Sequence, residues 1–364
     1  MLIKDVISEL EKFAPLAYQE SYDNCGLIVG NKETTVTGVL LSLDCVESVV
    51  EEAIQLKCNL VIAHHPIIFG GLKRLNGNNY VERTVIKAIQ NNIAIYAAHT
   101  NFDNVKEGVN AKIAEKLGLK NIKILAPKKQ LLKKLVTYVP ASHQEKVRTS
   151  LFEAGAGNIG NYDSCSFNIA GTGTYRGNEN SNPVIGEKGK LSTEPETRIE
   201  VIFEAVNESA ILRNLLANHP YEEVAFDVYP LDNSYQNVGS GMTGEFEKSI
   251  PETDFLNLVK KTFNLKVVKH TSLLNKPIKK VAFCGGSGSF LIKNAINSGS
   301  DAYISSDIKY HEFFDAESRI LIADTGHFEN EQFTPEIFYT LIQKKFTTFA
   351  TYLSKVNTNP VNYF

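Results

Sequence analysis

The sequence predicts an α/β protein: a discontinuous three-layer α/β module with a mixed sheet, interrupted by an inserted α+β domain of ferredoxin-like character. Two observations support this prediction. Short apolar runs alternate with helical patterns in the first third of the chain, and the same alternation resumes after residue 281. We therefore expect residues 1–128 and 246–364 to form one module, with residues 129–245 as the insert.

The first third begins with an amphipathic helix over residues 1–15 and continues in a repeated β-α-β order. Because strands joined by crossover helices usually run parallel, we expect a parallel or mixed sheet with helices packed on it. Binding sites in such sheets form at the carboxyl ends of the strands. The expected strands are 38–44, 59–66 and 93–100, and the expected helices are 46–57 and 81–92.

The pattern breaks near Pro127 into a lysine-rich stretch, and a different order of elements follows to about Tyr229. Strand, helix, Gly-rich tract, strand, helix and strand follow one another, which is typical of a separate α+β unit. The tract from Gly155 to Asn182 favours turns and loops with short strand-like pieces. The clearest of these elements are the strands 134–140, 198–205 and 222–231 and the helix 143–154.

The first theme returns in the last third of the chain. After a loop at 237–246, the patterns indicate strands and helices in alternation, ending in one long helix from about Glu331. This return indicates one interrupted module instead of successive domains. The expected strands are 281–289, 301–307 and 319–327, with a helix at 292–298.

The composition is that of a folded soluble protein. Of 364 residues, 43% are hydrophobic and 22% charged, which excludes long disorder, and no run of about 18 apolar residues suggests a membrane span. The formal net charge of -3 disfavours nucleic acid as a partner without excluding a local basic patch. The five cysteines are scattered without a C-x-x-C pair, so we expect a reducing compartment, a cytoplasmic location and no membrane partner.

Residues that can bind metals follow three of the expected strands. His64 and His65 point in different directions, so they suit two neighbouring ions better than one. Asp103 follows the third strand, where a carboxylate can bridge two cations. His327 and Glu331 are four residues apart at a helix start and share one helical face. Jointly these residues predict two divalent ions, with zinc the first expectation and manganese or iron as alternatives.

Each of these segments alone also has an ordinary explanation. The histidine pair could be packed and hydrogen-bonded, Asp103 could cap a helix, and His327 with Glu331 could be capping or exposed polar residues. Their common position at strand ends favours the metal centre. Such a centre activates water and polarises a bond of the substrate.

Two further groups lie at the same predicted edge. His99 is a candidate ligand or hydrogen-bonding partner, and Asp307 and His311 are candidates for proton transfer or substrate contact, with helix capping as the alternative. A Gly-rich segment between a strand and a helix could hold a phosphate with its backbone N–H groups, or could simply form a tight turn. Its candidate residues are Gly285, Gly286, Ser287 and Gly288.

The motifs resemble those of one family across nearly the whole chain. SYDNCGLIVG, LVIAHHP, AAHTNFD, FCGGSG, SDIKYH and DTGHFENE are similar to successive signatures of the GTP cyclohydrolase 1 type 2 homologue family, also called the Ngg-one-interacting-factor-like family. The insert, with GTGTYRGN and HPYEEVAFDVYPL, resembles nitrogen-regulatory or divalent-cation-tolerance proteins. Two positions depart from the family pattern: Tyr22 replaces a common Trp, and Asn330 a common Ser or Thr.

The resemblance implies a dinuclear centre at His64, His65, Asp103, His327 and Glu331, in subunits that form a toroidal homohexamer. The family name implies opening of the GTP purine ring by water, which yields formate and a dihydroneopterin triphosphate.

Two functions of different class follow from these observations. The first is a dinuclear metal-dependent hydrolase acting on GTP, another nucleotide or a phosphate-containing small molecule. The second is a metal-binding regulatory or scaffold protein whose inserted domain senses a small ligand. Metal storage or delivery is a third hypothesis, because histidine and carboxylate ligands can also bind ions without catalysis.

Overall fold

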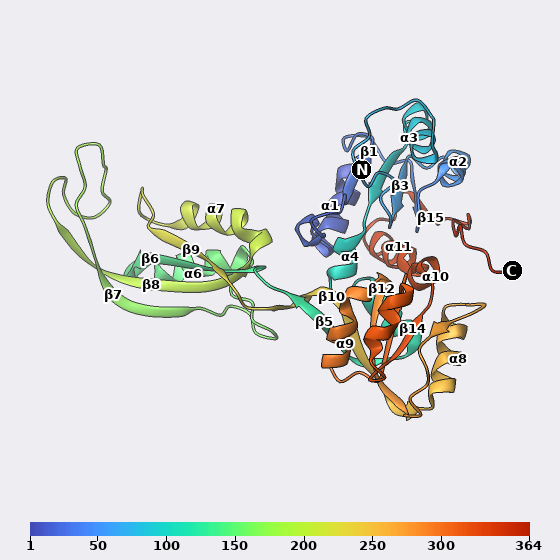
Figure 1. The fold of residues 1–364 in the computed structure, drawn as a ribbon. Coiled ribbons are helices and arrows are strands. Elements are labelled where there is room, and N and C mark those ends of the chain that lie inside the picture. The colour runs from blue at the N-terminus through green and yellow to red at the C-terminus, as the bar shows by residue number, and fades with distance from the viewer. The chain divides into compact units, whose positions relative to one another are not determined.

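The computed structural model describes all 364 residues, and the chain divides into two compact units (Figure 1). Unit 1 comprises Met1–Pro127 and Gln236–Phe364, and unit 2 comprises Lys128–Tyr235. Helices and mixed sheets build the structure, so the predicted α/β class is confirmed at that level. None of the helices has the length and apolar character needed to cross a membrane.

The first sheet of unit 1 has the strand order β1 (Gly26–Val29), β4 (Ala94–Ala97), β3 (Leu60–Ala63), β2 (Gly38–Ser42) and β15 (Ala350–Leu353). All neighbours run parallel except β1, which is antiparallel to β4. β2, β3 and β4 are buried along their whole length, as expected for strands covered on both faces. β15, from the end of the chain, was not predicted.

The second sheet of unit 1 has the order β11 (Lys269–His270), β14 (Leu321–Asp324), β13 (Ala302–Ser306), β12 (Ile278–Ser287), β10 (Tyr235–Ile250) and β5 (Lys120–Lys128). β12, β13 and β14 are parallel, while β10 and β11 are antiparallel to β12 and β14. The sequence predicted one mixed sheet for this module, and the structure has two. The first sheet is built from strands that precede unit 2, with β15 added from the end of the chain. The second sheet is built from strands that follow unit 2, with β5 added from before it.

Helices cover the sheets of unit 1 (Figure 1). Buried residues of two helices, among them Val49 and Val85, pack against Leu40 and Val61 of the first sheet. The long C-terminal helix expected from about Glu331 begins at Thr334, and a separate short helix that ends at Glu331 precedes it. The helices of unit 1 are α1 (Ile3–Phe13), α2 (Glu47–Gln55), α3 (Tyr80–Gln90), α4 (Thr100–Asn104), α5 (Val109–Leu117), α8 (Glu252–Thr262), α9 (Ile292–Asn297), α10 (His327–Glu331) and α11 (Thr334–Lys345), with 3-10 turns η1 (Leu16–Tyr18), η4 (Ser289–Leu291) and η5 (Tyr310–Ala316).

Buried contacts join the two halves of unit 1 where the candidate residues lie. The Phe102 ring of α4 packs edge-on against Phe338 of α11, with ring centroids 5.1 Å apart. The Asn110 amide donates to the Asp103 carbonyl at 3.0 Å and accepts from the Gly285 N–H at 2.9 Å. These bonds tie α4 and α5 to β12, so residues before and after unit 2 are fixed around one point.

Unit 2 is a four-stranded antiparallel sheet with two helices. Its strand order is β7 (Phe167–Tyr175), β8 (Ser192–Glu204), β6 (Leu132–Pro140) and β9 (Phe226–Leu231). Its helices are α6 (Gln144–Glu153) and α7 (Glu208–Asn218), with 3-10 turns η2 (Ala141–His143) and η3 (Ala205–Asn207). Ile199, Val201 and Phe203 of β8 pack with Val147 and Ile211 of the helices, so one face of the sheet carries the core.

Candidate metal centre

His64 is fully buried at the end of β3 and presents one nitrogen without a partner. Its Nδ1 lies 2.8 Å from the carbonyl oxygen of Ala98. Because a carbonyl oxygen only accepts, Nδ1 donates and Nε2 keeps its lone pair. Nε2 has no hydrogen bond and lies 3.6 Å from Asp103 Oδ1 and 3.6 Å from Glu331 Oε1. Burial lowers the pKa of His64 to about 4, which keeps the ring in the neutral form that a metal requires.

His65 contacts a different set of groups from His64, and two of them are carboxylates. Its Nδ1 lies 2.8 Å from Asp44 Oδ1 and its Nε2 lies 2.9 Å from Glu331 Oε2. Burial alone would lower the pKa of His65, but these two carboxylates outweigh burial and raise it to about 9. The Nε2 atoms of His65 and His327 are 3.2 Å apart. A divalent ion would replace the proton that holds these groups together.

His327 and Glu331 lie on one face of α10. His327 Nε2 is 3.1 Å from Glu331 Oε2, and His327 Nδ1 is 2.6 Å from Asp307 Oδ2. Burial lowers the pKa of His327, while hydrogen bonds to Asp307 and Glu331 outweigh it and raise the pKa to about 11. The predicted spacing of four residues therefore directs both side chains to the same point.

Glu331 is the buried carboxylate of the centre, and Asp103 is a half-buried one. Burial raises the pKa of Glu331, but the three histidines outweigh burial and hold it well below its usual range. Burial and the charge of Glu331 raise the pKa of Asp103 well above its usual range. Oδ1 of Asp103 is buried without a hydrogen-bond partner. Two such carboxylates repel each other unless a proton or cation lies between them.

The ligating atoms form overlapping groups that could hold metal ions. Glu331 belongs to two of them, one with His64 and Asp103 and one with His65 and His327. Within each group the ligand atoms lie within 4.8 Å of one another. The sequence suggested Asp103 as a bridge, whereas in the structure Glu331 has the position shared by both groups. The unpartnered atoms of His64 and Asp103 and the mixed imidazole and carboxylate donors fit a divalent cation such as zinc, manganese or iron.

His99 lies beside this cluster and is oriented by a carboxylate that sequence reasoning missed. It belongs to a third group with His64 and His65. Its Nδ1 lies 2.8 Å from Asp23 Oδ1, and the other oxygen of Asp23 accepts from the Thr100 N–H at 3.1 Å. Burial raises the pKa of Asp23, but the hydrogen bond and charge of His99, together with the bonds from Thr100 and Cys25, outweigh burial and lower the pKa, so Asp23 stays ionised.

Asp44 is the second carboxylate that the sequence reading did not select. It lies two residues after the end of β2, so the search for residues at strand ends could have found it. Asp23 lies between η1 and β1, where no strand precedes it, and only its place in the SYDNCGLIVG motif marked that segment.

Asp307 and His311 are separated by the structure. Asp307 has φ 56 and accepts a hydrogen bond from His327 Nδ1, so it orients the imidazole. His311 is exposed and packs against the rings of Tyr310 and Phe314. Asp307 lines the cavity at the centre, whereas His311, on the 3-10 turn η5, does not.

The Gly-rich segment is part of a strand up to Ser287, where a strand-to-helix loop was expected. A Cβ at Gly286, which has φ +65, would lie 2.4 Å from Glu331 Oε1, so only glycine lets this carboxylate approach. Gly285, Gly286 and Ser287 line the cavity at the centre, whereas Gly288 does not. The nearest helix, α9, starts only at Ile292. Close packing against Glu331 thus accounts for Gly286, and phosphate binding stays a prediction.

A cavity of about 700 Å³ opens at the centre. His65, His99 and Asp103 line it on one side, and residues of the C-terminal segment, including Asn359 and Tyr363, line another. The Asn359 amide donates to Glu329 Oε1 at 2.9 Å, and the neighbouring Thr358 hydroxyl bonds Asp44. No pattern in the sequence predicted that the last residues would form this wall.

Comparison with known proteins agrees with this fold. The model of the Duf34/NIF3 (NGG1p interacting factor 3) family matches residues 1–360. A GTP cyclohydrolase 1 type 2 homolog of Halalkalibacterium halodurans is 38% identical over 363 residues, covering 98% of each chain. One of Bacillus subtilis is 36% identical over 366 residues, covering 99% of this chain and 98% of that one.

A solved structure described as a Bacillus cereus protein related to NIF3 is 37% identical, with a TM-score of 0.87, and covers 100% of this chain and 99% of that one. The chain therefore belongs to the Duf34/NIF3 family.

Proposed function

We propose that this protein is a metal-dependent hydrolase with two divalent ions, zinc in the first place, at the centre described above. The observation that carries the proposal is the shared position of Glu331 in two ligand groups, one with His64 and Asp103 and one with His65 and His327. A metal pair so held would activate water at neutral pH and polarise the bond under attack.

The protein's own residues orient the ligands and move protons. Asp44 and Asp307 hold Nδ1 of His65 and His327, so each ring directs Nε2 toward Glu331. His99, held by Asp23, lies within the same cluster and is the group that we assign to proton transfer. Asp307 acts through His327, and we assign it a positioning role.

A nucleotide is the substrate class that we favour, with GTP first. The cavity of about 700 Å³ is large enough for one, and Lys269, Gly285, Gly286 and Ser287 supply a cation and backbone groups along its wall. Curated relatives carry the name GTP cyclohydrolase 1 type 2 homolog, which supports testing GTP before other phosphate-containing molecules.

The remaining expectations belong to the same proposal. Residues 129–245 would form an inserted ferredoxin-like domain, and the chain would assemble as a cytoplasmic homohexamer. A regulatory protein whose insert senses a small ligand is the second candidate function, and the observation that favours it is a cavity of about 640 Å³ within unit 2.

Turnover by metal-loaded protein tests the proposal. Purified protein would be stripped of metal, reloaded with zinc, manganese or iron, and assayed with GTP, other nucleotides and simple phosphoesters. We expect turnover with at least one metal and its abolition by Asp103→Asn. His270→Ala is the matched control, since His270 is exposed and outside the cavity. Absence of turnover with every metal and substrate would refute the hydrolase.

A further inference from the structure

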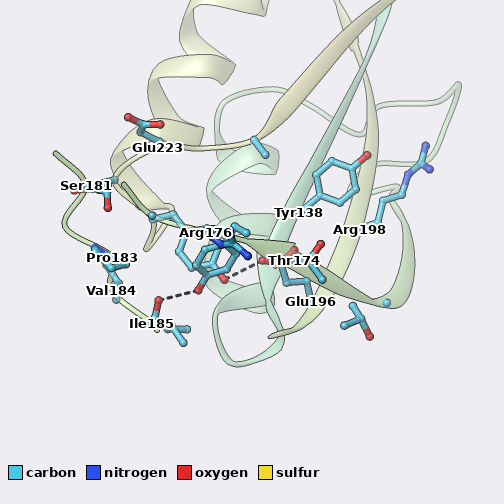
Figure 2. Close-up of a pocket in the computed structure, with 18 of the residues that line it drawn as sticks. Tyr138, Thr174, Arg176, Ser181, Pro183, Val184, Ile185, Glu196, Arg198 and Glu223 are labelled. Carbon is cyan, nitrogen blue, oxygen red and sulfur yellow. Dashed lines mark hydrogen bonds between the residues drawn. The ribbon is translucent and has the colours of Figure 1, made fainter. Parts of the chain in front are cut away.

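Unit 2 contains a cavity of about 640 Å³ that is formed entirely by its own residues (Figure 2). Its walls come from the β7–β8 hairpin, from β6 and from the segment that leads into β9. This volume is within the range of small-molecule sites. The hydroxyl of Tyr175 donates to the Ile185 carbonyl at 2.9 Å, the bond drawn at Ile185 in Figure 2, and so fastens the hairpin loop along one side.

The cavity lies on the face of the sheet opposite to the helices. Ile199 and Val201 of β8 point into the core beneath α6 and α7. Because side chains alternate along a strand, Glu196 and Arg198 point to the other face. Across the ladder, Gly171 pairs with Glu196, and Ile169 and Tyr138 both pair with Arg198. Glu196 and Arg198 therefore lie on an inner strand of the sheet, with a neighbouring strand on each side.

Glu196 is a buried carboxylate with hydrogen-bonding capacity to spare. Only 9% of the residue is exposed, although no cation pairs with it. Its single protein donor is the Tyr221 hydroxyl, 2.9 Å from Oε1. A Cβ at Gly173 would lie only 2.1 Å from Oε2. Oε2 can therefore occupy its position only because residue 173 is glycine. A buried carboxylate normally accepts several hydrogen bonds, so a ligand with N–H donors would complete its shell.

Two arginines supply positive charge to the same cavity. Arg198 pairs through Nη2 with Glu200 Oε1 at 2.8 Å, while its Nε is buried without a partner. Arg176, at the start of the hairpin loop, is exposed and has no ion pair. In Figure 2, Arg176 and Glu196 are drawn between the loop residues Pro183–Ile185 on one side and Tyr138 and Arg198 on the other. The cavity therefore offers a buried anion and free cationic groups together.

Aromatic rings supply the third element of the cavity. The rings of Tyr175 and Tyr221 meet edge to face at 62°, with centroids 5.7 Å apart. Tyr221 is held in place by His219, whose Nδ1 accepts from the Tyr221 N–H at 3.1 Å and whose Nε2 donates to the Tyr138 carbonyl at 2.9 Å. Rings fixed in this way favour a flat, polarisable ligand.

We propose that this cavity binds a small anionic molecule with a planar ring whose edge presents N–H donors, the chemistry of a guanine nucleotide. The ring edge donates to Glu196, the ring packs on the tyrosines, and the anionic group pairs with Arg176 and the free Nε of Arg198. This site is separate from the metal centre and does not depend on the proposed hydrolase activity.

Calorimetric titration of the full chain with guanosine 5′-monophosphate tests the site. The protein is first stripped of metal and carries Asp103→Asn, so that the metal centre does not contribute. We expect saturable binding, weakened about tenfold or more by Glu196→Gln, because a hydrogen bond between charged and polar groups is lost. Glu194→Gln, on the same strand and outside the cavity, is the matched control and is expected to bind as the parent does.

Arg176→Ala is the second variant, because Arg176 is exposed and unpaired and its loss leaves the fold intact. It should weaken the nucleotide and leave guanosine unchanged, whereas Arg213→Ala on α7 should alter neither. Xanthosine 5′-monophosphate, which places an oxygen where guanine has an amino group, should bind more weakly. Absence of binding, equal binding by Glu196→Gln, or equal binding of the xanthine analogue or of inorganic phosphate would overturn the proposal.

Discussion

The two cavities of this protein differ in how their charged groups are satisfied. At the candidate metal centre, every imidazole has a partner at Nδ1 and Glu331 contacts three rings, and the buried atoms left without a partner are His64 Nε2 and Asp103 Oδ1. In unit 2, Glu196 has one hydroxyl donor and the nearby arginines keep free N–H groups. The first arrangement suits a compact multivalent cation. The second leaves room for a larger ligand that carries both donors and negative charge.

Replacement of Glu331 should have the largest effect on metal binding and turnover. Glu331→Gln removes the one carboxylate that both ligand groups share, so we expect loss of metal from both positions and a decrease in turnover of more than about 100-fold, since loss of an outer partner alone costs 10- to 100-fold. Mass spectrometry measures the metal content, and an activity assay measures the turnover. Glu336→Gln on α11, where Glu336 pairs with Lys116, is the control. Retention of full metal content would contradict the shared position.

Removal of Asp44 should have an intermediate effect. Asp44→Asn leaves all five candidate ligands in place but loosens Nδ1 of His65, so metal affinity should decrease by about 10- to 100-fold. Competition with a chromophoric chelator measures the affinity. If Asp44→Asn bound metal as tightly as the parent protein, the orienting role of Asp44 would be wrong.

The stability of the metal-free protein should decrease as pH rises from about 6.5 to 9. The folded pKa of His65 is raised to about 9, so its stabilising contribution is complete below the unfolded value and disappears as pH passes the folded one. The raised pKa of Asp103 acts in the same direction, and so does that of His327, whose folded value of about 11 extends the decrease beyond pH 9. Glu331 and His64 do not titrate in this window.

Metal-loaded protein should show the opposite trend, because ions bind the deprotonated rings. Thermal unfolding of both forms between pH 6 and 9.5 measures the difference. A metal-free protein whose stability rose across this window would contradict the assignment of protonated histidines to the empty centre.

The smallest effect is expected from His311. The residue is exposed on η5 and does not line the cavity, so His311→Ala should change kcat/KM by less than about twofold. His99→Ala is the contrasting variant and should lower kcat, because His99 lies inside the cluster. A large effect of His311→Ala would show that η5 moves toward the centre during turnover.

The sequence predicted the grouping of the candidate ligands better than the sheets around them. His64 and Asp103 follow neighbouring parallel strands of the first sheet, so strand order brings these two residues together. His327 follows β14 of the second sheet, so it reaches them only through the packing of the two sheets. Which strands share a sheet depends on pairing across long separations. The two-sheet arrangement and β15, four residues long and exposed at most positions, had no local signal.

Local geometry explains the remaining differences. Asp307 and His311 were both candidates for proton transfer or substrate contact, but only Asp307 lines the cavity. The backbone at Asp307 is left-handed, and His311 lies on the 3-10 turn that follows. The cavity of unit 2 was not predicted. Tyr221 lies in the HPYEEVAFDVYPL segment, but no local pattern relates it to Tyr138 and Glu196, which it meets only through strand pairing and the loop before β9.

Anomalous diffraction from crystals of the metal-loaded protein tests the central claim most directly. We predict two peaks for each chain, one among His64, Asp103 and Glu331 and the other among His65, His327 and Glu331, with one oxygen of Glu331 directed to each. A single peak, or a second ion that Glu331 does not contact, would contradict the account.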